Sequence, residues 1–431
     1  MRHLMLAAAA TLACAAPALS ENRIDLIRPD APELAARGTH PVGVRAASFT
    51  DPDRIDVIAA TEQGGTPTAD RTLQTEIWYP AADATEPGTT YDTILRDGAT
   101  PTTLTGSAAR DAAPADGTFP LVILSHGYPG NRYLMSHLAE NLASKGYVVV
   151  AADHPDSTYD DQGAFASTLV NRAVDQRFLL DSMAGLEDEV GAITDADNAA
   201  IVGYSMGGYG ALIFGGAGLS PDAVARTEPE RMVPPAGLLD RLAAGSDDHA
   251  SLVDPRVKAV VAIAPWGRQH DFWDAEGLAG ITKPLLLVSG SDDDVSIYDA
   301  IRQIYDQTTG TSRHLLTFEH ANHNAAAPIP APAEAWAMSE SLGRAPFDHY
   351  ADAVWDSVRM NNILQHFTTA FLDQHLKAED RAAFLDLVPD SADGVWSVDD
   401  AGTPDDAHSY WAGFPDRSAK GLMFETKPAG Q

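Results

Sequence analysis

One serine of this 431-residue chain lies where a hydrolytic nucleophile would be expected. Ser205 is the central residue of the pattern G-Y-S-M-G at 203–207, which follows the apolar run 199–202 and leads into an apolar segment at 208–213. This order predicts a strand, a tight turn and a helix, in which the glycines permit close approach and the turn holds the serine hydroxyl outward. We therefore expect Ser205 to attack acyl carbons. The alternative is a turn whose serine only caps the following helix.

A serine hydroxyl is a poor nucleophile unless a base removes its proton, and the base must be oriented by an acid. A run of three aspartates follows the strand predicted at 284–289. Among them we favour Asp293, because it lies just past the turn, where its side chain can reach back over the strand end. Asp292 is the alternative acid, and the remaining carboxylates of the run are expected to be solvated.

The base is a choice between two histidines. His320 and His323 both follow the strand predicted at 314–318. His323 lies further into the loop, whereas His320 almost abuts the strand, so we favour His323 and keep His320 as the alternative. The two histidines lack a third ligand cluster, and the aspartate run lacks the alternating ligands and the glycine of a calcium loop. The sequence therefore predicts no metal site.

The tetrahedral intermediate of acyl transfer needs two backbone N–H donors. Met206 directly follows the serine at the start of the predicted helix, where the helix dipole also favours negative charge. The second donor is expected in the loop 125–130, which follows the first buried strand. Tyr128 is our candidate in this loop, since its neighbour Pro129 has no N–H to give. We expect His126 to brace the loop rather than to act as a second base.

Apolar runs and helical segments alternate along the middle of the chain. Strands are predicted at 42–49, 71–79, 121–124, 147–152, 199–203, 257–264, 284–289 and 314–318. Helices are predicted at 133–144, 165–186, 206–214, 297–305 and 350–376. Short continuous apolar strands separated by helices indicate one doubly wound, mostly parallel α/β sheet with helices on both faces.

Composition divides the chain further. Residues 21–118 are expected to form an N-terminal extension with the early strands, and 81–117 a long surface excursion within it. The catalytic core is expected at 119–376, followed by a polar tail at 377–431. Residues 215–254, rich in Gly, Pro and Asp, interrupt the core just after the nucleophile helix. A lid or pocket wall and a plain surface insertion are equally compatible with this segment.

The charge balance excludes one class of partner. The chain carries 61 acidic and 29 basic residues, a formal charge of −32. Such a surface repels phosphate backbones and anionic lipid headgroups, so we do not expect nucleic acid as a partner.

The first twenty residues have the pattern of an export signal. Arg2 precedes an apolar stretch at 4–16, and residues 18–20 suit cleavage by a signal peptidase. The stretch is too short to span a membrane, so we expect a secreted or periplasmic protein that begins near Glu21. Cys14, the only cysteine, lies inside the signal, and its acylation in a lipoprotein is the alternative. Cleavage at the predicted site would leave no thiol nucleophile.

Several stretches resemble one branch of the α/β hydrolases. They are T-E-I-W-Y-P-A at 75–81, L-S-H-G-Y-P-G-N-R at 124–132, L-A-S-K-G-Y-V-V-V at 142–150 and D-H-P-D at 153–156. Together with the serine motif they are similar to the platelet-activating-factor acetylhydrolase and dienelactone-hydrolase-like branch. The resemblance implies the α/β-hydrolase fold and a Ser-Asp-His esterase without a cofactor, and it supports Tyr128 and Met206 as oxyanion donors. The chain lacks the cysteine nucleophile of true dienelactone hydrolases, so dienelactone is not the expected substrate.

The stretch A-I-A-P-W at 262–266 resembles the strand end of cutinase-like polyester hydrolases, where an aromatic side chain lines an open cleft. We therefore expect Trp266, together with Tyr204 beside the nucleophile, to line the substrate pocket; ordinary core packing is the alternative for the tryptophan.

The expected substrates are short-acyl, phospholipid-type or polyester esters, small or polymeric. An amidase or peptidase of the same fold and a non-catalytic envelope binding protein are the alternative functions. Oligomeric state is left open.

Overall fold

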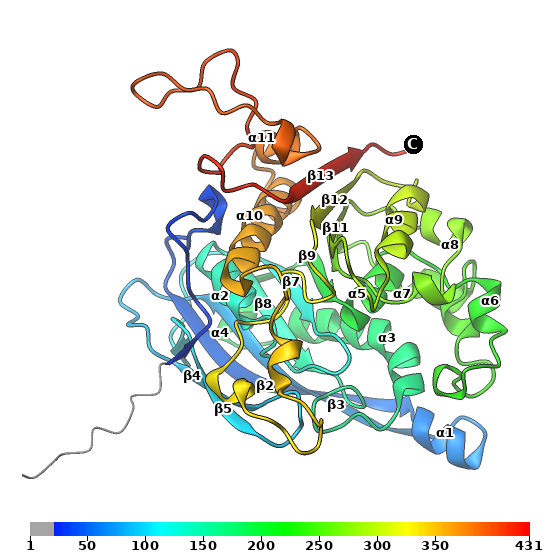
Figure 1. The fold of residues 1–431 in the computed structure, drawn as a ribbon. Coiled ribbons are helices and arrows are strands. Elements are labelled where there is room, and N and C mark those ends of the chain that lie inside the picture. The colour runs from blue at the N-terminus through cyan, green and yellow to red at the C-terminus, as the bar shows by residue number, and fades with distance from the viewer. Residues whose placement is uncertain (1–20) are drawn as a thin grey trace, which may run out of the picture.

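A ten-stranded sheet forms the centre of the molecule (Figure 1). The structure, a computed structural model, describes residues 21–431, so the predicted export signal and Cys14 lie outside the described residues. In order across the sheet, the strands are β13 (Leu422–Lys427), β12 (Arg313–Phe318), β11 (Leu285–Gly290), β10 (Val257–Ile263), β9 (Thr194–Tyr204), β7 (Phe119–Ser125), β8 (Val148–Asp153), β3 (Thr68–Pro80), β2 (Val42–Ile55) and β6 (Ala109–Arg110).

The strands in the middle of this order run parallel to one another. Each neighbouring pair from β12 across to β8 is parallel. β3 and β2 are antiparallel at one side of the sheet, and β13 is antiparallel to β12 at the other. Every residue of β11 and β12 is buried, as expected of strands that are covered on both faces. The predicted doubly wound, mostly parallel sheet is confirmed.

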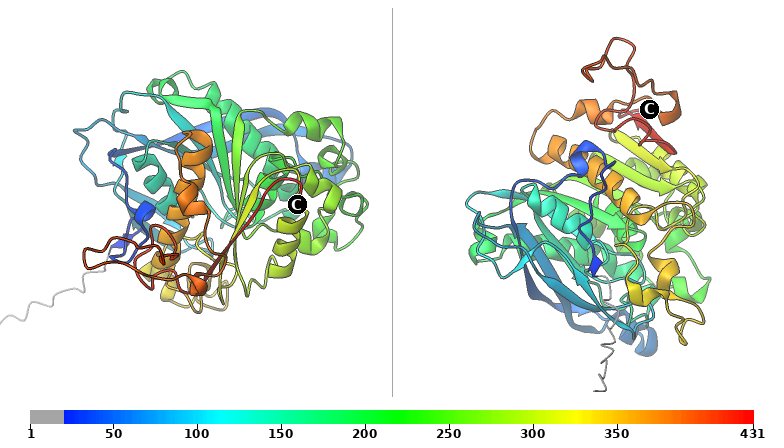
Figure 2. Two further views of the ribbon diagram at one scale, coloured as in Figure 1. Left: turned by 90° about the horizontal axis from the view of Figure 1, so that it is seen from above. Right: turned by 60° about the vertical axis from the view of Figure 1, so that its left-hand side comes forward.

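Helices cover both faces of the sheet. The longer ones are α2 (Ser136–Ser144), α3 (Phe165–Ala184), α5 (Met206–Phe214), α9 (Tyr298–Gln307) and α10 (Ser357–Leu376). α10, orange in Figure 2, lies with α2 on one face, whereas α3, α5 and α9 lie on the other. Because successive strand residues point to opposite faces, Val122 belongs to the core that contains α2 and α10, and Ile123 belongs to the core of the opposite face.

Short helices complete the chain. They are α1 (Val57–Gln63), α4 (Glu189–Ala192), α6 (Pro221–Val224), α7 (Asp247–Leu252), α8 (Ala275–Ala279), α11 (Ala382–Leu385) and the 3-10 turns η1 (Glu33–Ala35), η2 (Glu230–Met232), η3 (Asp240–Leu242), η4 (Arg268–His270), η5 (Ala333–Trp336), η6 (Pro346–His349) and η7 (Ser391–Asp393). Within residues 21–431, no helix combines the length and the apolar character that a membrane crossing requires.

The segment 81–117 is more ordered than the surface excursion predicted for it. β4 (Thr90–Ile94) and β5 (Pro101–Thr105) form a hairpin, and β1 (Asn22–Arg23) pairs with β5 to complete a separate three-stranded sheet. Tyr91 and Leu104 of this hairpin are buried in the core that contains α2 and α10. The strands are short and rich in threonine, with too few apolar residues for a clear strand pattern.

The C-terminal segment also differs from the polar tail predicted for 377–431. Its last strand, β13, pairs along the whole length of β12 and so extends the main sheet. Phe424 of β13 stacks on Phe367 of α10, with ring centroids 4.8 Å apart, and Trp411 is buried in the same core. These aromatic residues are widely spaced among polar ones, so no periodic signal marks them in the sequence.

The last long helix is shorter than predicted. α10 begins at Ser357 rather than at Tyr350, because the Asp356 carboxylate accepts a hydrogen bond from the Arg359 N–H at 2.8 Å and caps the helix there. Val354, which fits the apolar face of the longer predicted helix, is 66% exposed in the loop before it.

The insertion at 215–254 consists of loops and short helices. Three of its leucines, Leu238, Leu239 and Leu242, are buried in the core that contains α3. These leucines anchor the segment on the fold, although most of its other residues after 220 are partly or fully exposed.

Candidate active site

The predicted elbow around Ser205 is formed by the end of β9 and the start of α5. Ser205 lies between them with φ 53° and ψ −112°, a conformation that residues with a side chain rarely adopt. A Cβ atom at Gly203 would lie 2.2 Å from the Gly207 carbonyl oxygen, and one at Gly207 would lie 1.9 Å from the Ser125 carbonyl oxygen. Only glycine fits at these two positions, which explains the spacing of the motif.

The serine hydroxyl does not cap the helix that follows it. No side-chain hydrogen bond from Ser205 closes the first turn of α5. Instead, Ser205 Oγ lies 2.9 Å from His323 Nε2. The Ser205 backbone is fixed on both sides, because its N–H donates to the Ile263 carbonyl at 2.8 Å and its carbonyl accepts from the Trp266 N–H at 3.1 Å. The elbow therefore aims the hydroxyl at the histidine.

Asp293 lies on the far side of the same imidazole. His323 Nδ1 is 3.1 Å from Asp293 Oδ1 and 3.0 Å from Oδ2, so Nδ1 carries the proton and Nε2 is free to accept one from Ser205. Ser205, His323 and Asp293 are called the cavity triad below. They come from the loops after β9, β12 and β11, which all end at the same edge of the sheet.

The Asp293 carboxylate is buried and well satisfied. Burial raises the pKa of this group, but the hydrogen bond from His323 and those from the backbone N–H groups of Ser296 and Val295 outweigh burial, so the pKa lies below its usual range. The two backbone bonds measure 2.8 and 2.9 Å. Asp293 is thus a fixed negative charge that can orient the imidazole and stabilise its protonated form.

The alternative acid and base lie elsewhere. Asp292 and His320 face each other at 3.6 Å, with side chains that are 62% and 75% exposed. Neither makes a hydrogen bond with Ser205. The structure thus brings Asp293 and His323 to the serine and leaves the other pair in solvent.

The two predicted oxyanion donors flank the serine. Met206 is the first residue of α5, so its N–H has no acceptor within the helix. The N–H of Tyr128 has no hydrogen-bond partner anywhere in residues 21–431. The loop that carries Tyr128 approaches the nucleophile closely, since a Cβ atom at Gly127 would lie 3.3 Å from Ser205 Cβ. Both amides are available to a ligand.

A second Ser-His-Asp chain lies behind this loop. Ser125 Oγ is 2.9 Å from His154 Nε2, and His154 Nδ1 is 3.1 Å from Asp175 Oδ2. All three side chains, here called the buried triad, are at most 1% exposed. The backbone N–H of His154 donates to His126 Nε2 at 3.2 Å, and His126 Nδ1 donates to the Gly127 carbonyl at 2.7 Å. His126 braces the loop, as the sequence suggests, and the buried triad supports it.

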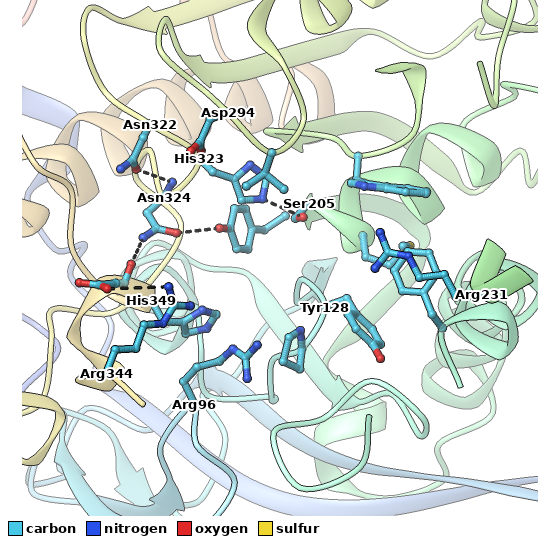
Figure 3. A pocket seen from close by; sticks show the side chains of 17 residues that line it. Arg96, Tyr128, Ser205, Arg231, Asp294, Asn322, His323, Asn324, Arg344 and His349 are labelled. Carbon is cyan, nitrogen blue, oxygen red and sulfur yellow. Dashed lines mark hydrogen bonds and ion pairs between the residues drawn. The ribbon is translucent and has the colours of Figure 1, made fainter. Parts of the chain in front are cut away.

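A cavity of about 470 Å³ opens at Ser205 (Figure 3). Its lining consists of Arg96, Tyr128, Pro129, Phe165, Tyr204, Ser205, Met206, Arg231, Trp266, Asp294, Val295, Asn322, His323, Asn324, Arg344, Asp348 and His349. This set includes every residue expected in the site except Asp293, which lies behind His323.

The predicted pocket residues Trp266 and Tyr204 occupy different parts of the cavity wall. Trp266 is 7% exposed and packs edge-on against Phe165, with ring centroids 5.2 Å apart. The Tyr204 ring lies 5.3 Å from that of His323, and its hydroxyl donates to Asn324 Oδ1 at 3.1 Å. Trp266 is thus both core and wall, and Tyr204 packs beside the predicted base.

No pattern in the sequence indicates that three arginines line the cavity. Arg96 comes from the β4–β5 hairpin, Arg231 from the insertion at 215–254, and Arg344 from the loop before η6. All three lie in polar segments whose course over the sheet cannot be read from local patterns. Through Arg231, the insertion forms part of the pocket wall, as one of its two interpretations proposed.

Within residues 21–431, no three His, Cys, Asp or Glu side chains are arranged to hold a metal ion. The site does contain a serine hydrogen-bonded to a base, a base oriented by a carboxylate, and two backbone amides near the serine that have no hydrogen-bond partner among the described residues. Such a set is suited to nucleophilic attack on a carbonyl carbon and to stabilisation of the resulting oxyanion.

Part of the chain is similar to known hydrolases. A family model described as the alpha/beta hydrolase fold matches residues 120–226, which contain the Tyr128 loop and the Ser205 elbow. Cutinase est1 of Thermobifida alba is 35% identical over 95 residues, which are 22% of this chain and 30% of the cutinase. A cutinase of Thermobifida fusca (strain YX) is 31% identical over 101 residues, 22% of this chain and 29% of that protein. The chain thus spans about a third of the length of the curated relatives it matches.

The likeness in three dimensions extends further. A ferulic acid esterase from Streptomyces cinnamoneus superimposes with a TM-score of 0.55 at 21% identity, covering 81% of this chain and 94% of that one. These similarities do not single out the platelet-activating-factor acetylhydrolase and dienelactone-hydrolase-like branch, which stays a prediction. The sheet order, the matched segment and the superposition agree on the architecture: the chain has the α/β-hydrolase fold.

Proposed function

We propose that this chain is a serine carboxylic-ester hydrolase that works through an acyl-enzyme. One observation carries the proposal. A strained serine at the mouth of a cavity is hydrogen-bonded to a histidine, at 2.9 Å, whose other nitrogen is held by a buried carboxylate. The ester activity implied by the names of the cutinase and ferulic acid esterase relatives agrees with this chemistry.

The first half of the reaction forms the acyl-enzyme. Ser205 Oγ attacks the acyl carbon of the ester while His323 Nε2 accepts the hydroxyl proton. The carbonyl oxygen becomes an oxyanion, to which the N–H groups of Tyr128 and Met206 donate. Asp293 stabilises the protonated imidazole. His323 then gives its proton to the alcohol oxygen, the ester C–O bond breaks, and the alcohol leaves.

The second half releases the acid. Water takes the place of the alcohol, His323 removes one of its protons, and the resulting oxygen nucleophile attacks the acyl carbon on Ser205. Collapse of this second intermediate returns the proton to Ser205 Oγ. Every proton in the cycle passes through His323 Nε2, so the free lone pair that Asp293 secures on this nitrogen is required twice.

The wall of the cavity is suited to bind ester substrates that have at least one apolar portion. Trp266, Phe165 and Tyr128 form a contiguous aromatic surface, in which Tyr128 packs edge-on against Phe165 at 4.9 Å. Short-acyl esters, phospholipid-type acetyl esters and segments of a polyester chain are the candidate substrates.

The test is hydrolysis of 4-nitrophenyl esters from acetate to laurate by the wild type and by Ser205→Ala. We expect turnover by the wild type, a chain-length optimum set by the cavity, and labelling of Ser205 by a fluorophosphonate probe. Absence of both turnover and labelling would contradict the proposal and favour a non-catalytic envelope protein. Faster cleavage of 4-nitroanilides than of matched esters would favour an amidase instead.

We further propose that the enzyme acts outside the cytoplasm, on the strength of the export pattern in residues 1–20. Mass spectrometry of the protein isolated from its native cells is expected to give an N-terminus near Glu21. An N-terminal acylated Cys14 would show a lipoprotein, and retention of residues 1–20 would contradict export.

A further inference from the structure

The cavity differs in charge from the chain as a whole. Acidic residues outnumber basic ones 61 to 29 in the sequence, yet the cavity lining contains three arginines and only two aspartates, Asp294 and Asp348. A concave site with an excess of one sign of charge attracts ligands of the opposite sign. An arginine that binds such an anionic ligand must have a guanidinium group that no carboxylate already occupies.

Two of the three arginines lie in solvent. Arg344 Nη1 is 3.9 Å from the Asp348 carboxylate, and both side chains are 63% exposed, so water screens this pair. Arg231 is also exposed, and its guanidinium lies over the Phe165 ring at 5.6 Å. Neither combines burial with a vacant guanidinium.

Arg96 does combine them. Its side chain is partly buried, and within residues 21–431 it makes no ion pair and donates no side-chain hydrogen bond. The side chains whose charge acts most strongly on it are Tyr159, Arg344, Tyr350 and Tyr128, with no carboxylate among them. Burial lowers the pKa of Arg96 from its ordinary value. A partly buried cation with no counter-ion is stabilised when a ligand supplies the anion.

The hairpin turn holds Arg96 in place. The Arg96 backbone N–H donates to the Tyr350 hydroxyl at 3.1 Å, and the turn is closed by a hydrogen bond from the Thr100 N–H to the Asp97 carboxylate at 2.9 Å. A Cβ atom at Gly98 would lie 2.4 Å from the Tyr159 carbonyl oxygen, so the tip of the turn is packed against the rest of the molecule. In Figure 3 the Arg96 side chain extends into the cavity between His349 and Tyr128.

We propose that the esters cleaved by this chain carry a carboxylate, and that Arg96 binds this carboxylate while the ester carbonyl lies at Ser205. A single vacant guanidinium, with its planar set of N–H donors, matches the charge and shape of one carboxylate. The substrate class is therefore monoesters of dicarboxylic acids, or esters whose alcohol bears a carboxylate. The inference rests on the proposed esterase activity and specifies its substrate.

Two pairs of esters test the inference and distinguish the sources of the charge. The first pair is the mono-4-nitrophenyl ester of glutaric acid and its neutral carboxamide analogue, which differ in charge on the acyl side. The second pair is 4-acetoxybenzoate and 4-acetoxybenzamide, which differ on the alcohol side. We expect the wild type to prefer the charged member of one pair by about tenfold or more in kcat/KM, as a charge-assisted hydrogen bond allows.

Arg96→Gln is the diagnostic variant, and Arg344→Gln is the matched control. Arg96→Gln is expected to abolish the preference, because it lowers kcat/KM for the charged ester far more than for its neutral partner. Arg344→Gln is expected to keep the preference within about threefold, since its charge is already paired and screened. Arg96→Lys, which retains the charge without the planar donors, should retain part of the preference.

Several outcomes would overturn the inference. Equal kcat/KM for the charged and neutral members of both pairs in the wild type would do so, as would an unchanged preference in Arg96→Gln. If Arg96→Gln does not fold, the salt dependence of the wild type tests the inference. Raising the salt from 0.05 to 0.5 M must then lower kcat/KM for the charged esters and leave that of the neutral esters unchanged.

Failure of the esterase activity itself gives a different result. None of the four esters would then be turned over, and calorimetric titration of glutarate and of 4-hydroxybenzoate would test the carboxylate site alone. Binding to the wild type that weakens at least about tenfold in Arg96→Gln would support the site, and equal binding or no binding to the two proteins would reject it.

Discussion

The cavity triad and the buried triad have nearly the same hydrogen-bond geometry. The distance from serine Oγ to histidine Nε2 is 2.9 Å in both, and the shortest histidine to aspartate contact is 3.0 Å in one and 3.1 Å in the other. Their surroundings differ. Ser205 lies at a strained turn beside a cavity and two vacant amides, whereas Ser125 is the last residue of β7 and is fully buried.

The aspartates differ as much as the serines. Asp293 accepts hydrogen bonds only from its histidine and from backbone N–H groups. Asp175 also accepts from Arg71 at 2.8 Å and from Arg54 at 3.2 Å, so its charge is shared with two guanidinium groups. A Ser-His-Asp hydrogen-bond chain therefore does not define a nucleophile by itself. Access to a substrate and donors for the oxyanion distinguish the catalytic arrangement from the structural one.

Substitution of the two serines should give the largest difference. Ser205→Ala removes the attacking oxygen, and kcat for 4-nitrophenyl butyrate is expected to fall about 10⁴-fold or more. Ser125→Ala removes one buried hydrogen bond, so kcat is expected to stay within about tenfold of the wild type. Steady-state rates of the two purified variants measure this, and losses of equal size would refute the functional distinction between the triads.

Substitution of the two aspartates should affect different properties, namely the activity for Asp293 and the stability for Asp175. Asp293→Asn is expected to lower kcat by about 10³- to 10⁴-fold, because the amide no longer holds the required tautomer of His323. Asp175→Asn is expected to cost about 3–5 kcal/mol of unfolding free energy, because Arg54 and Arg71 lose their buried counter-ion. Urea unfolding and rates measured on the same samples make the comparison. A stable Asp175→Asn protein with greatly reduced kcat would place the second aspartate in the chemistry.

The lowered pKa of the histidine in the buried triad makes the stability of the fold depend on pH. Burial and then the nearby Arg172 lower the pKa of His154 to about 4, although Asp175 acts in the opposite direction. The unfolded state, with a histidine pKa near 6.5, binds more protons between these two values. The contribution of His154 is therefore complete above about pH 6.5 and is lost as the pH falls toward 4.

Other buried histidines steepen the same decline. Burial lowers the pKa of His137 and of His366 to about 3. Each such group reduces the unfolding free energy by up to about 1.4 kcal/mol per pH unit below 6.5. Thermal unfolding at pH 8, 6.5, 5 and 4 is expected to show little change over the first step and a progressive loss thereafter. A constant Tm from pH 7 to 4.5 would contradict the neutral state of these histidines.

The smallest effects are expected at the exposed pair beside the cavity triad. Asp292→Asn and His320→Gln should each change kcat/KM by less than about twofold, since both side chains lie in solvent and an exposed pair contributes at most about 1 kcal/mol. The same ester assay measures this. A loss of about 10²-fold in either variant would mean that the exposed residue, rather than its neighbour in the cavity triad, serves as the acid or base.

The sequence predicted the parallel sheet, and it pointed to three site candidates that the structure brings together, because each has a local cause. Ser205, Asp293 and His323 follow apolar strands directly, and parallel strands end at one edge of a sheet. The buried triad had no such signal, since Asp175 lies in the middle of α3, Ser125 ends β7 and His154 directly follows β8. Only the folded chain places these three groups together.

The cavity wall was the least predictable part. Arg96 and Arg231 come from segments that are polar in composition, and their position depends on the packing of a small sheet and of an insertion over the main one. The pairing of strand β13 was equally hard to predict, because its partner β12 precedes it by about a hundred residues. Side-chain periodicity reports the faces of an element and carries no information about which distant segment will cover it.

The strand β13 has a consequence for the behaviour of the protein in concentrated solution. Without it, β12 would be the last strand of the sheet, and the N–H and C=O groups along one side of this buried strand would be left unpaired. Such an edge is a template for pairing with another chain. A protein shortened before Leu422 would therefore tend to associate edge to edge in spite of its formal charge of −32, so its colloidal stability depends on its final ten residues as well as on its acidic surface.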